Sequence, residues 1–249
     1  YAIQKLISGE FSWKRWLHIS FIVLTSLMGL AFVLVACIPF LKDWLIQSNL
    51  IADQFAVENL KADVSWSGFE WLIGVFFLVI ILLSIFRIRA RKMKFIYVLF
   101  LGSLITVYSL IMVITPKIEQ YSQHAAIEFY KMCAKNGFDV ETLSFKSYAT
   151  LFYGKLKPQT MNNRSFKAYA IKRLVSLREE GETKNAVMYT GLIHTNWLEV
   201  GDIQEPGFFV GKITNLDEIR ERRPALKELY RQNGFVFFIR MPEKKTAEK

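Results

Sequence analysis

The sequence predicts an α-helical membrane protein, with three transmembrane helices followed by a small α/β domain. Composition is the first reason, since 52% of the residues are hydrophobic and 15% are aromatic. The excess lies in three apolar runs in the first half of the chain. The run from Phe95 to Thr115 carries no charge and is long enough to cross the ~30 Å core of a bilayer as a helix. The second half alternates helix-like and strand-like segments, which is typical of an α/β domain.

We expect the membrane region to occupy residues 1–115 and the soluble domain residues 116–249. The first span ends at Pro39, and the second is short, with Arg87 at its end able to extend its charge to the interface. Pro116 and Lys117 follow the third span. The expected spans are residues 17–40, 71–86 and 95–115, with connecting loops 41–70 and 87–94.

The chain has a formal net charge of +10, which raises nucleic acid as a partner. The position of the basic residues argues against it, because five of them lie in one short loop between apolar runs. They are Arg87, Arg89, Arg91, Lys92 and Lys94. Basic residues accumulate in the cytoplasmic loops of membrane proteins. We therefore expect membrane lipid as a partner, and no nucleic acid.

The same charges predict an orientation. The basic residues at 14–15 and 87–94 belong on the cytoplasmic side, which places the N-terminus inside and both loop 41–70 and the C-terminal domain outside. In a bacterium this is the inner membrane with a periplasmic domain.

The chain begins at Tyr1 without Met, so we expect it to be the C-terminal piece of a longer protein. Its cysteines, Cys37 and Cys133, do not define a redox compartment.

Loop 41–70 is acidic where loop 87–94 is basic. Trp44, Ile51 and Phe55 recur near helical spacing, which predicts a helix lying on the bilayer surface. The carboxylates of this loop have two interpretations, a catalytic or metal site and an ordinary solvated loop. Their spacing favours the solvated loop.

The soluble domain begins with a helix over 117–135, which Asn136-Gly137 ends. A strand over 138–145 and a short helix over 146–153 follow. A helix over 168–180 carries Ile171, Leu174, Val175 and Arg178 at helical spacing. We then expect a strand at 186–190 and a loop at 191–206.

The last segments predict a sheet with helices on both faces. A strand over 208–213 leads to Asn215 and Glu218, which resemble a capping box at the start of a helix. Pro224 would start a further helical stretch with Leu226, Leu229 and Tyr230, ended by Asn233-Gly234. The near-continuous apolar run 235–240 is typical of a strand covered on both faces, in a parallel or mixed sheet.

No catalytic constellation is visible, so the catalytic residues are unknown from the residues alone. The histidines, His18, His124 and His194, are scattered, and no cysteine or carboxylate cluster stands at metal-ligand spacing. We therefore predict no metal site within this chain. No motif identifies a cofactor, and a metal requirement of the whole protein stays open.

An aromatic and basic set around the start of the soluble domain has two interpretations. It is a surface that contacts substrate or lipid headgroups, with its lysines near phosphates, or its aromatic residues belong to the core and its lysines to the solvated rim. The second is the simpler. The set comprises Tyr121, His124, Lys146, Tyr148, Phe152, Tyr153 and Lys155.

Several segments together are similar to a known family. They are PKIEQYSQHAAIEFYK after the last span, FKSYATLFYGKLKP, PGFFVGKI, LKELYRQNGFVFF and the loop ending ADVSWSGFEWLIG. The pattern resembles the C-terminal region of the ArnT-like and protein O-mannosyltransferase family (glycosyltransferase family 39) of membrane enzymes, particularly the Bacteroidetes type.

The resemblance implies a GT-C fold, whose active site faces the periplasm. It implies a polyprenyl-phosphate sugar as donor and a lipid or protein as acceptor. The catalytic acids of that family lie in the first large periplasmic loop, which we expect upstream of Tyr1.

Two other interpretations of the function remain. One is a non-catalytic, membrane-anchored periplasmic binding or assembly protein. The other, a transporter or channel subunit, is disfavoured by the absence of charge in the predicted spans.

Overall fold

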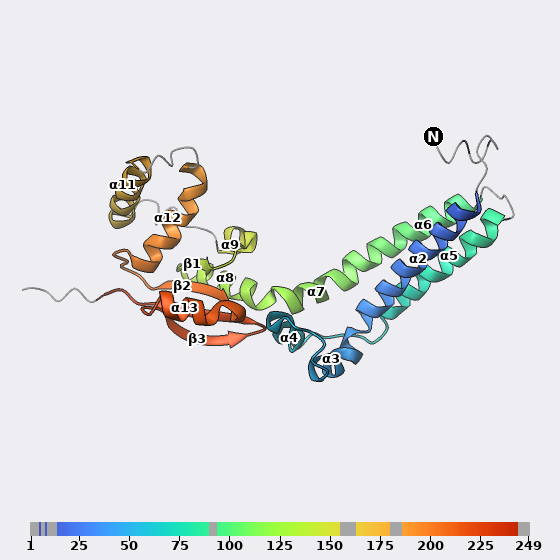
Figure 1. Cartoon of the computed structure of the whole chain (residues 1–249), viewed down its shortest axis with the longest axis horizontal. Coiled ribbons are helices and arrows are strands. Elements are labelled where there is room, and N and C mark those ends of the chain that lie inside the picture. Colours follow the sequence, from blue (N-terminus) through green and yellow to red (C-terminus); the bar gives the residue numbers. More distant parts are fainter. Residues whose placement is uncertain are drawn as a thin grey trace, which may run out of the picture. The chain divides into compact units, whose positions relative to one another are not determined.

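The structure, a computed structural model, describes residues 5, 8, 14–89, 94–154, 163–179 and 186–243. It is mostly helical with one small sheet, and it divides into two compact units, shown in Figure 1. The first unit comprises Tyr1–Leu50 and Asp63–Tyr121, and the second comprises Ile51–Ala62 and Ser122–Lys249. Part of the predicted extracytoplasmic loop, Ile51–Ala62, therefore belongs to the same unit as the C-terminal residues.

The first unit is a bundle of apolar helices. Helix α2 (Arg15–Ala36) packs against α5 (Trp71–Arg89), which packs against α6 (Lys94–Ser109). Gly74 permits the first of these contacts, because a Cβ atom there would lie 2.7 Å from the backbone nitrogen of Val33. Small residues at such crossings let two helix backbones approach closely, as in membrane bundles.

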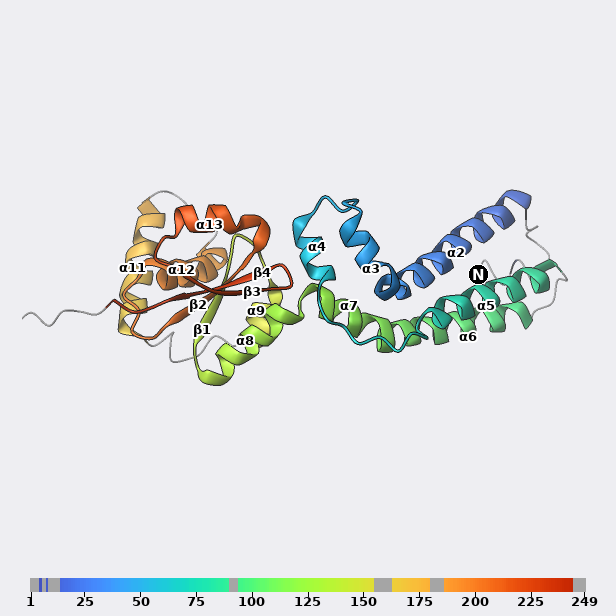
Figure 2. The same cartoon turned by 90° about the horizontal axis from the view of Figure 1, so that it is seen from below.

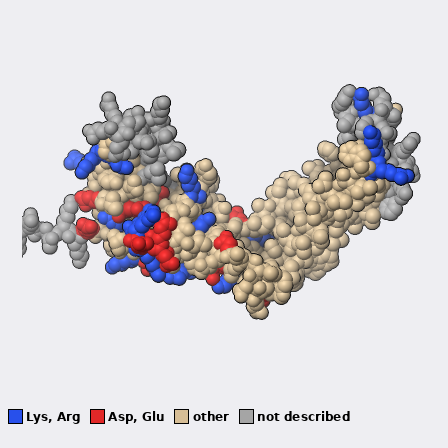
Figure 3. Space-filling view, in the orientation of Figure 1, with Lys and Arg blue, Asp and Glu red and all other residues tan. Residues whose placement is uncertain are grey.

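Two helices in the described part of the chain are long and apolar enough to cross a membrane. They are Arg15–Ala36 and Tyr97–Ser122, while the apolar helix Trp71–Ile85 is shorter. Large apolar side chains cover the outside of this unit, with Phe100 74% exposed and Met112 67% exposed. Figure 3 shows a surface almost free of charge along these helices, and basic atoms at the end where α2 begins. The two long helices correspond to the first and third predicted spans.

Neither of the two prolines that were expected to end a membrane span, Pro39 and Pro116, does so. The first helix ends at Cys37, and Pro39 lies in the first turn of α3 (Ile38–Gln47), where its missing N–H group removes no helical hydrogen bond. In the third span, α6 continues as a π-helical turn, Leu110–Ile114, and then as α7 (Thr115–Ser122). The wider turn carries the helix past Pro116, because the Thr115 N–H bonds to the carbonyl of Leu110.

The second unit contains a four-stranded mixed sheet in the order β1-β2-β4-β3. Strand β1 (Asp139–Leu143) is parallel to β2 (Gly207–Lys212), and the other pairs are antiparallel. The central strand β4 (Phe235–Arg240) confirms the prediction of a strand covered on both faces, and β3 (Lys227–Gln232) forms an edge. Phe235 and Phe237 belong to one core, and Val236 and Phe238 to the other.

Helices form the two outer layers of this unit, as Figures 1 and 2 show. One layer contains α8 (His124–Asn136), α9 (Tyr148–Tyr153) and α4 (Gln54–Leu60). The opposite layer contains α11 (Arg164–Glu179), α12 (Ala186–Val200) and α13 (Leu216–Arg222). The unit is therefore an α/β/α sandwich, within which the small α/β domain expected from the sequence is found.

The expected strand at 186–190 and loop at 191–206 are wrong, because α12 occupies Ala186–Val200. Ile193, His194, Trp197 and Leu198 are buried along its described part. Their spacing is helical, but Gly191 and the polar residues between them obscure the period. In α11, the spaced residues Ile171, Leu174 and Val175 are exposed, whereas Phe166, Tyr169 and Ala170 pack into the core.

The helix expected after Pro224 is also wrong, since the segment forms β3. Asn233 and Gly234 adopt φ values of 49° and 77°, the left-handed conformation that a two-residue hairpin turn requires at both positions. The pair therefore connects two strands instead of ending a helix. Asn215 makes no capping hydrogen bond to α13: its Oδ1 accepts from the Thr214 hydroxyl, and its amide N–H group donates to the carbonyl of Ser144.

The prediction that Phe55 lies on a helix at the bilayer surface is wrong, because its side chain packs against the sheet. Asp53 caps α4 by accepting a hydrogen bond from the Phe55 N–H at 2.9 Å. The Phe55 ring then packs edge-on against Phe235 at 5.1 Å between centroids, and Lys212 Nζ lies 4.7 Å above it. These contacts explain why Ile51–Ala62 belongs to the α/β unit. Trp44, in α3 of the first unit, is 59% exposed.

Candidate functional site

The predicted aromatic and basic set is divided between the two units. Tyr121 is buried in the first unit, whereas the other described members lie in the second. His124 and Lys146 are exposed, and Tyr153 is half-buried with Lys131 Nζ 5.2 Å above its ring. Lys155 lies outside the described residues.

Three large side chains of α9 are exposed, and they form what we term the α9 row. Tyr148 is 85% exposed, Leu151 63% and Phe152 73%. Their i, i+3, i+4 spacing places them on one side of the helix. Tyr148 and Phe152 are thus outside the core, contrary to the simpler interpretation of the set. This row borders a cleft that the sequence analysis did not detect.

The cleft lies at β1, an edge strand of the sheet, and we term it the β1-edge cleft. Its empty space is about 240 Å³, including the open mouth. Residues from three elements line it, from β1, from α9 with the glycine that follows it, and from α12. The described lining residues are Asp139, Val140, Glu141, Thr150, Leu151, Gly154 and His194.

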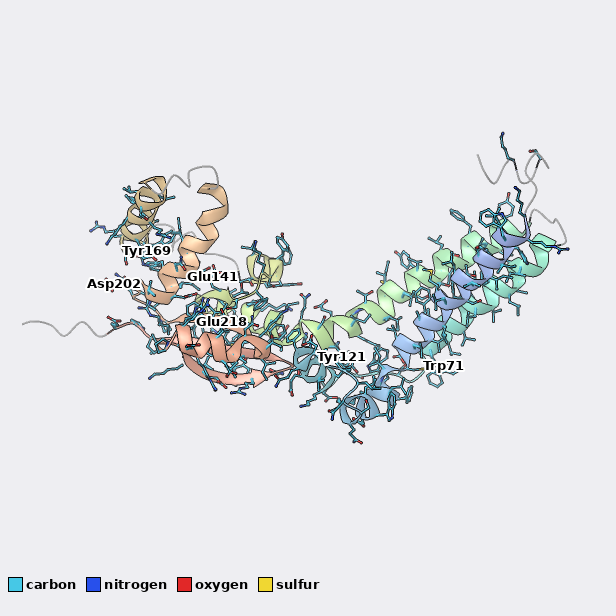
Figure 4. All side chains as sticks on the ribbon, in the orientation of Figure 1. Trp71, Tyr121, Glu141, Tyr169, Asp202 and Glu218 are labelled. Carbon is cyan, nitrogen blue, oxygen red and sulfur yellow. The ribbon has the colours of Figure 1, made fainter. Side chains whose placement is uncertain are left out.

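Alternation along β1 explains on which face of the sheet Glu141 lies. Val140 points into the core beneath α8, so Glu141 points to the opposite face. Glu141 pairs in register with Phe209, whose ring belongs to the core beneath α12. Glu141, which Figure 4 labels, therefore lies on the face that α12 covers. His194 belongs to α12.

His194 and Glu141 form the polar centre of the cleft. His194 Nδ1 lies 2.7 Å from Glu141 Oε1, and the histidine side chain is only 3% exposed. The rings of Phe166 and Trp197 pack around the imidazole at 5.7 and 6.0 Å between centroids. The other ring nitrogen, Nε2, is buried without a hydrogen bond, as is the hydroxyl of Thr150.

This arrangement fixes the hydrogen-bonding roles of the histidine. A carboxylate only accepts, so the Nδ1–H group donates to Glu141, and a neutral imidazole then presents a lone pair at Nε2. His194 Nε2 is therefore able to accept a hydrogen bond from a group bound in the cleft.

Sequence reasoning missed both residues. His194 was expected in a loop and Glu141 within an ordinary strand, and 53 positions separate them. The available signal was the helical spacing of Ile193, Trp197 and Leu198, which would have placed His194 on a packed helix. Nothing in the local sequence connects that helix with β1.

A second polar group, the Glu70 cluster, lies in the first unit. Glu70 accepts hydrogen bonds from the N–H groups of Ser67 and Gly68, at 2.7 and 2.9 Å, and Lys117 Nζ lies 3.2 Å from its Oε1. Lys117 Nζ also lies 5.0 Å above the Trp66 ring. Burial raises the pKa of Glu70, but the hydrogen bonds from this loop and from Lys117 outweigh it and lower the pKa to about 2.

Tyr121 belongs to the same cluster. The indole N–H of Trp66 donates to its hydroxyl at 3.1 Å. The Glu70 cluster therefore joins two segments that carried the family resemblance, the one around Trp66 and the one that begins at Pro116. The charged groups of the cluster, Glu70 and Lys117, are paired with each other. The cluster therefore has a structural role, because it holds the loop against α7.

The other potentially reactive groups in the described part of the chain are metal-ligand side chains and two thiols. Among the described residues, no three His, Cys, Asp or Glu side chains are grouped as metal ligands. Cys37 and Cys133 are both free thiols. Burial raises the pKa of Cys133 to about 12, which disfavours the nucleophilic thiolate.

Comparison with known proteins identifies no relative, since no family model, no curated protein and no solved structure matches this chain. The fold and the cleft therefore define the class only coarsely, as a protein with two helices long enough to span a membrane and an α/β unit.

Proposed function

We propose that this chain is the C-terminal portion of an integral-membrane glycosyltransferase of the GT-C type. The enzyme would transfer a sugar from a polyprenyl-phosphate donor to a lipid or protein acceptor on the periplasmic side. The observation that carries the proposal is the order of elements along the chain. Two helices of membrane length precede an α/β unit, and the segments that resemble the ArnT-like and protein O-mannosyltransferase family run from the loop before α5 through the α/β unit.

In this proposal α2, α5 and α6 with α7 are three crossings of a bacterial inner membrane. Helix α5 is short for a perpendicular crossing, and local thinning of the bilayer accommodates such a mismatch at modest cost. The basic end of the bundle faces the cytoplasm and the α/β unit the periplasm. A reporter enzyme that is active only in the periplasm, fused after Lys249, should be active. A cytoplasmic reporter that is active there instead would refute this topology.

Transfer from a polyprenyl phosphate needs a carboxylate that takes a proton from the acceptor while the sugar C1 leaves the phosphate. Within the described residues, Glu70 and Glu141 are engaged by Lys117 and His194, respectively. The family resemblance implies that the catalytic carboxylate lies in an earlier part of the enzyme, and the proposal adopts this assignment. This chain would contribute the last membrane helices and a periplasmic cap.

The test is sugar transfer by the product of the complete reading frame. Membranes containing it are incubated with radiolabelled polyprenyl-phosphate sugars, and label is measured in the lipid and protein fractions. We expect transfer that depends on the segment upstream of Tyr1. If the complete product is folded and inserted but transfers no sugar from any such donor, the proposal fails.

A second candidate is a non-catalytic, membrane-anchored periplasmic binding or assembly protein. The β1-edge cleft favours it, because a buried histidine nitrogen and an exposed aromatic row suit ligand recognition without chemistry. Ligand binding by the α/β unit with no transfer by the complete gene product would select this candidate.

A further inference from the structure

We propose that the β1-edge cleft binds a hydroxyl group of a carbohydrate, with His194 Nε2 as the acceptor and the Thr150 hydroxyl as the donor. This inference rests on the geometry of the cleft and is independent of whether the protein transfers sugar. It assigns the cleft a class of ligand, which the transferase proposal does not do.

The first step is the acceptor. His194 is fixed through Nδ1 by Glu141 at 2.7 Å, and its Nε2 is buried with no hydrogen bond. A buried acceptor without a partner costs about 1–3 kcal/mol. A ligand that donates a hydrogen bond recovers this cost, so the site is selective for donors.

The second step is the donor. Thr150 lines the same cleft from α9, and its Oγ1 is buried near the Tyr130 hydroxyl without a well-aligned hydrogen bond. A threonine hydroxyl both donates and accepts. With Nε2 able only to accept, the group that satisfies both atoms must donate to one and accept from the other. A hydroxyl group does this.

The charges of the cleft exclude the main competitors. Asp139 and Glu141 line it, and none of its described lining residues is Lys or Arg. A phosphate or carboxylate would meet like charge and an acceptor that cannot donate. An ammonium group would suit His194 and Glu141 but has no lone pair to accept from Thr150. A neutral group that both donates and accepts remains, and a ligand hydroxyl is such a group.

The mouth of the cleft indicates what carries the hydroxyl. Leu151 both lines the cleft and belongs to the α9 row, which leads outward to Tyr148 and Phe152. The base has room for a water-sized group, so a hydroxyl enters while the rest of the ligand stays outside. A sugar ring presents C–H groups on one face and hydroxyls at its edge. The C–H face fits the α9 row, and an edge hydroxyl fits the polar base of the β1-edge cleft.

The test is saturation-transfer NMR on the 249-residue chain in lipid nanodiscs. The probes are the methyl α-glycosides of mannose, glucose and galactose. We expect transfer to at least one of them. Thr150→Val keeps the shape of the side chain and removes the donor, and should weaken binding about fivefold to tenfold, as expected for one hydrogen bond. Thr142→Val makes the same change in β1, at a residue that does not line the cleft, and as the matched control it should leave binding unchanged.

A second pair of variants tests the acceptor. His194→Phe should abolish binding, with His124→Phe on the exposed start of α8 as control. If His194→Phe fails to fold, Leu151→Asp replaces it, because this residue is 63% exposed and a carboxylate there would obstruct the mouth. The proposal is overturned if none of the glycosides receives saturation, if Thr150→Val binds as well as the wild type, or if inorganic phosphate competes for the site.

Discussion

The Glu70 cluster makes the sharpest prediction about stability. Glu70 is 5% exposed, and its pKa falls from an ordinary 4.5 to about 2. A difference of this size corresponds to about 3 kcal/mol in favour of the ionised carboxylate in the folded protein. Replacing Glu70 by Gln keeps the shape but removes the charge, and it leaves Lys117 without its carboxylate. We expect the free energy of unfolding to fall by about 2–3 kcal/mol at neutral pH.

The sign of the pH dependence follows from the lowered pKa. The folded state holds its proton less tightly than the unfolded state, so the stabilisation is fully present above about pH 4.5 and is lost as the pH falls towards 2. Unfolding of the chain in detergent micelles, followed by tryptophan fluorescence at several pH values, measures this. Wild type and Glu70→Gln should differ at pH 6 and converge near pH 2.

The control is Glu119→Gln, which changes an exposed carboxylate on the same helix as Lys117. It should change the stability by less than about 0.5 kcal/mol. A constant difference between wild type and Glu70→Gln from pH 6 to pH 2 would refute the reasoning. It would mean that the loss comes from packing and not from the charge of Glu70.

The sequence predicted most elements whose signal is local. Uncharged apolar length predicted the long helices of the first unit, and the unbroken run 235–240 predicted a strand with two covered faces. Asn136-Gly137 correctly predicted the end of α8, where Gly137 takes a φ of 81°. Asn233-Gly234 is the same dipeptide, but it forms the turn between β3 and β4 instead of ending a helix. An Asn-Gly pair allows positive φ in either case, and only the strand-forming partner at 235–240 decides for a hairpin.

The candidate site could not be predicted in the same way, because long-range packing creates it. Glu141 reaches His194 only through the register of β1 on β2 and the docking of α12 on that face. Likewise, Phe55 was expected at a bilayer surface because its local spacing is amphipathic. A pattern of apolar residues predicts that a helix has a packed side, but it does not identify the partner, which here is the β4 side of the sheet.

Three further predictions concern packing. Gly74→Ala should separate α2 from α5 and lower the midpoint of thermal unfolding, because its Cβ would lie 2.7 Å from the Val33 backbone nitrogen; an unchanged midpoint would contradict this close approach. Phe55→Ala should release α4 and raise amide hydrogen exchange over 54–60 at least tenfold, whereas Trp44→Ala, at an exposed position in α3, should leave exchange there unchanged. Cys133 should resist maleimide at pH 8 in a Cys37→Ser background and react on unfolding, because burial both covers its sulfur and raises its pKa to about 12. Rapid labelling of the folded protein would show that α8 opens readily from the sheet, and the core formed by Phe129, Val210 and Phe237 would then not hold that layer in place.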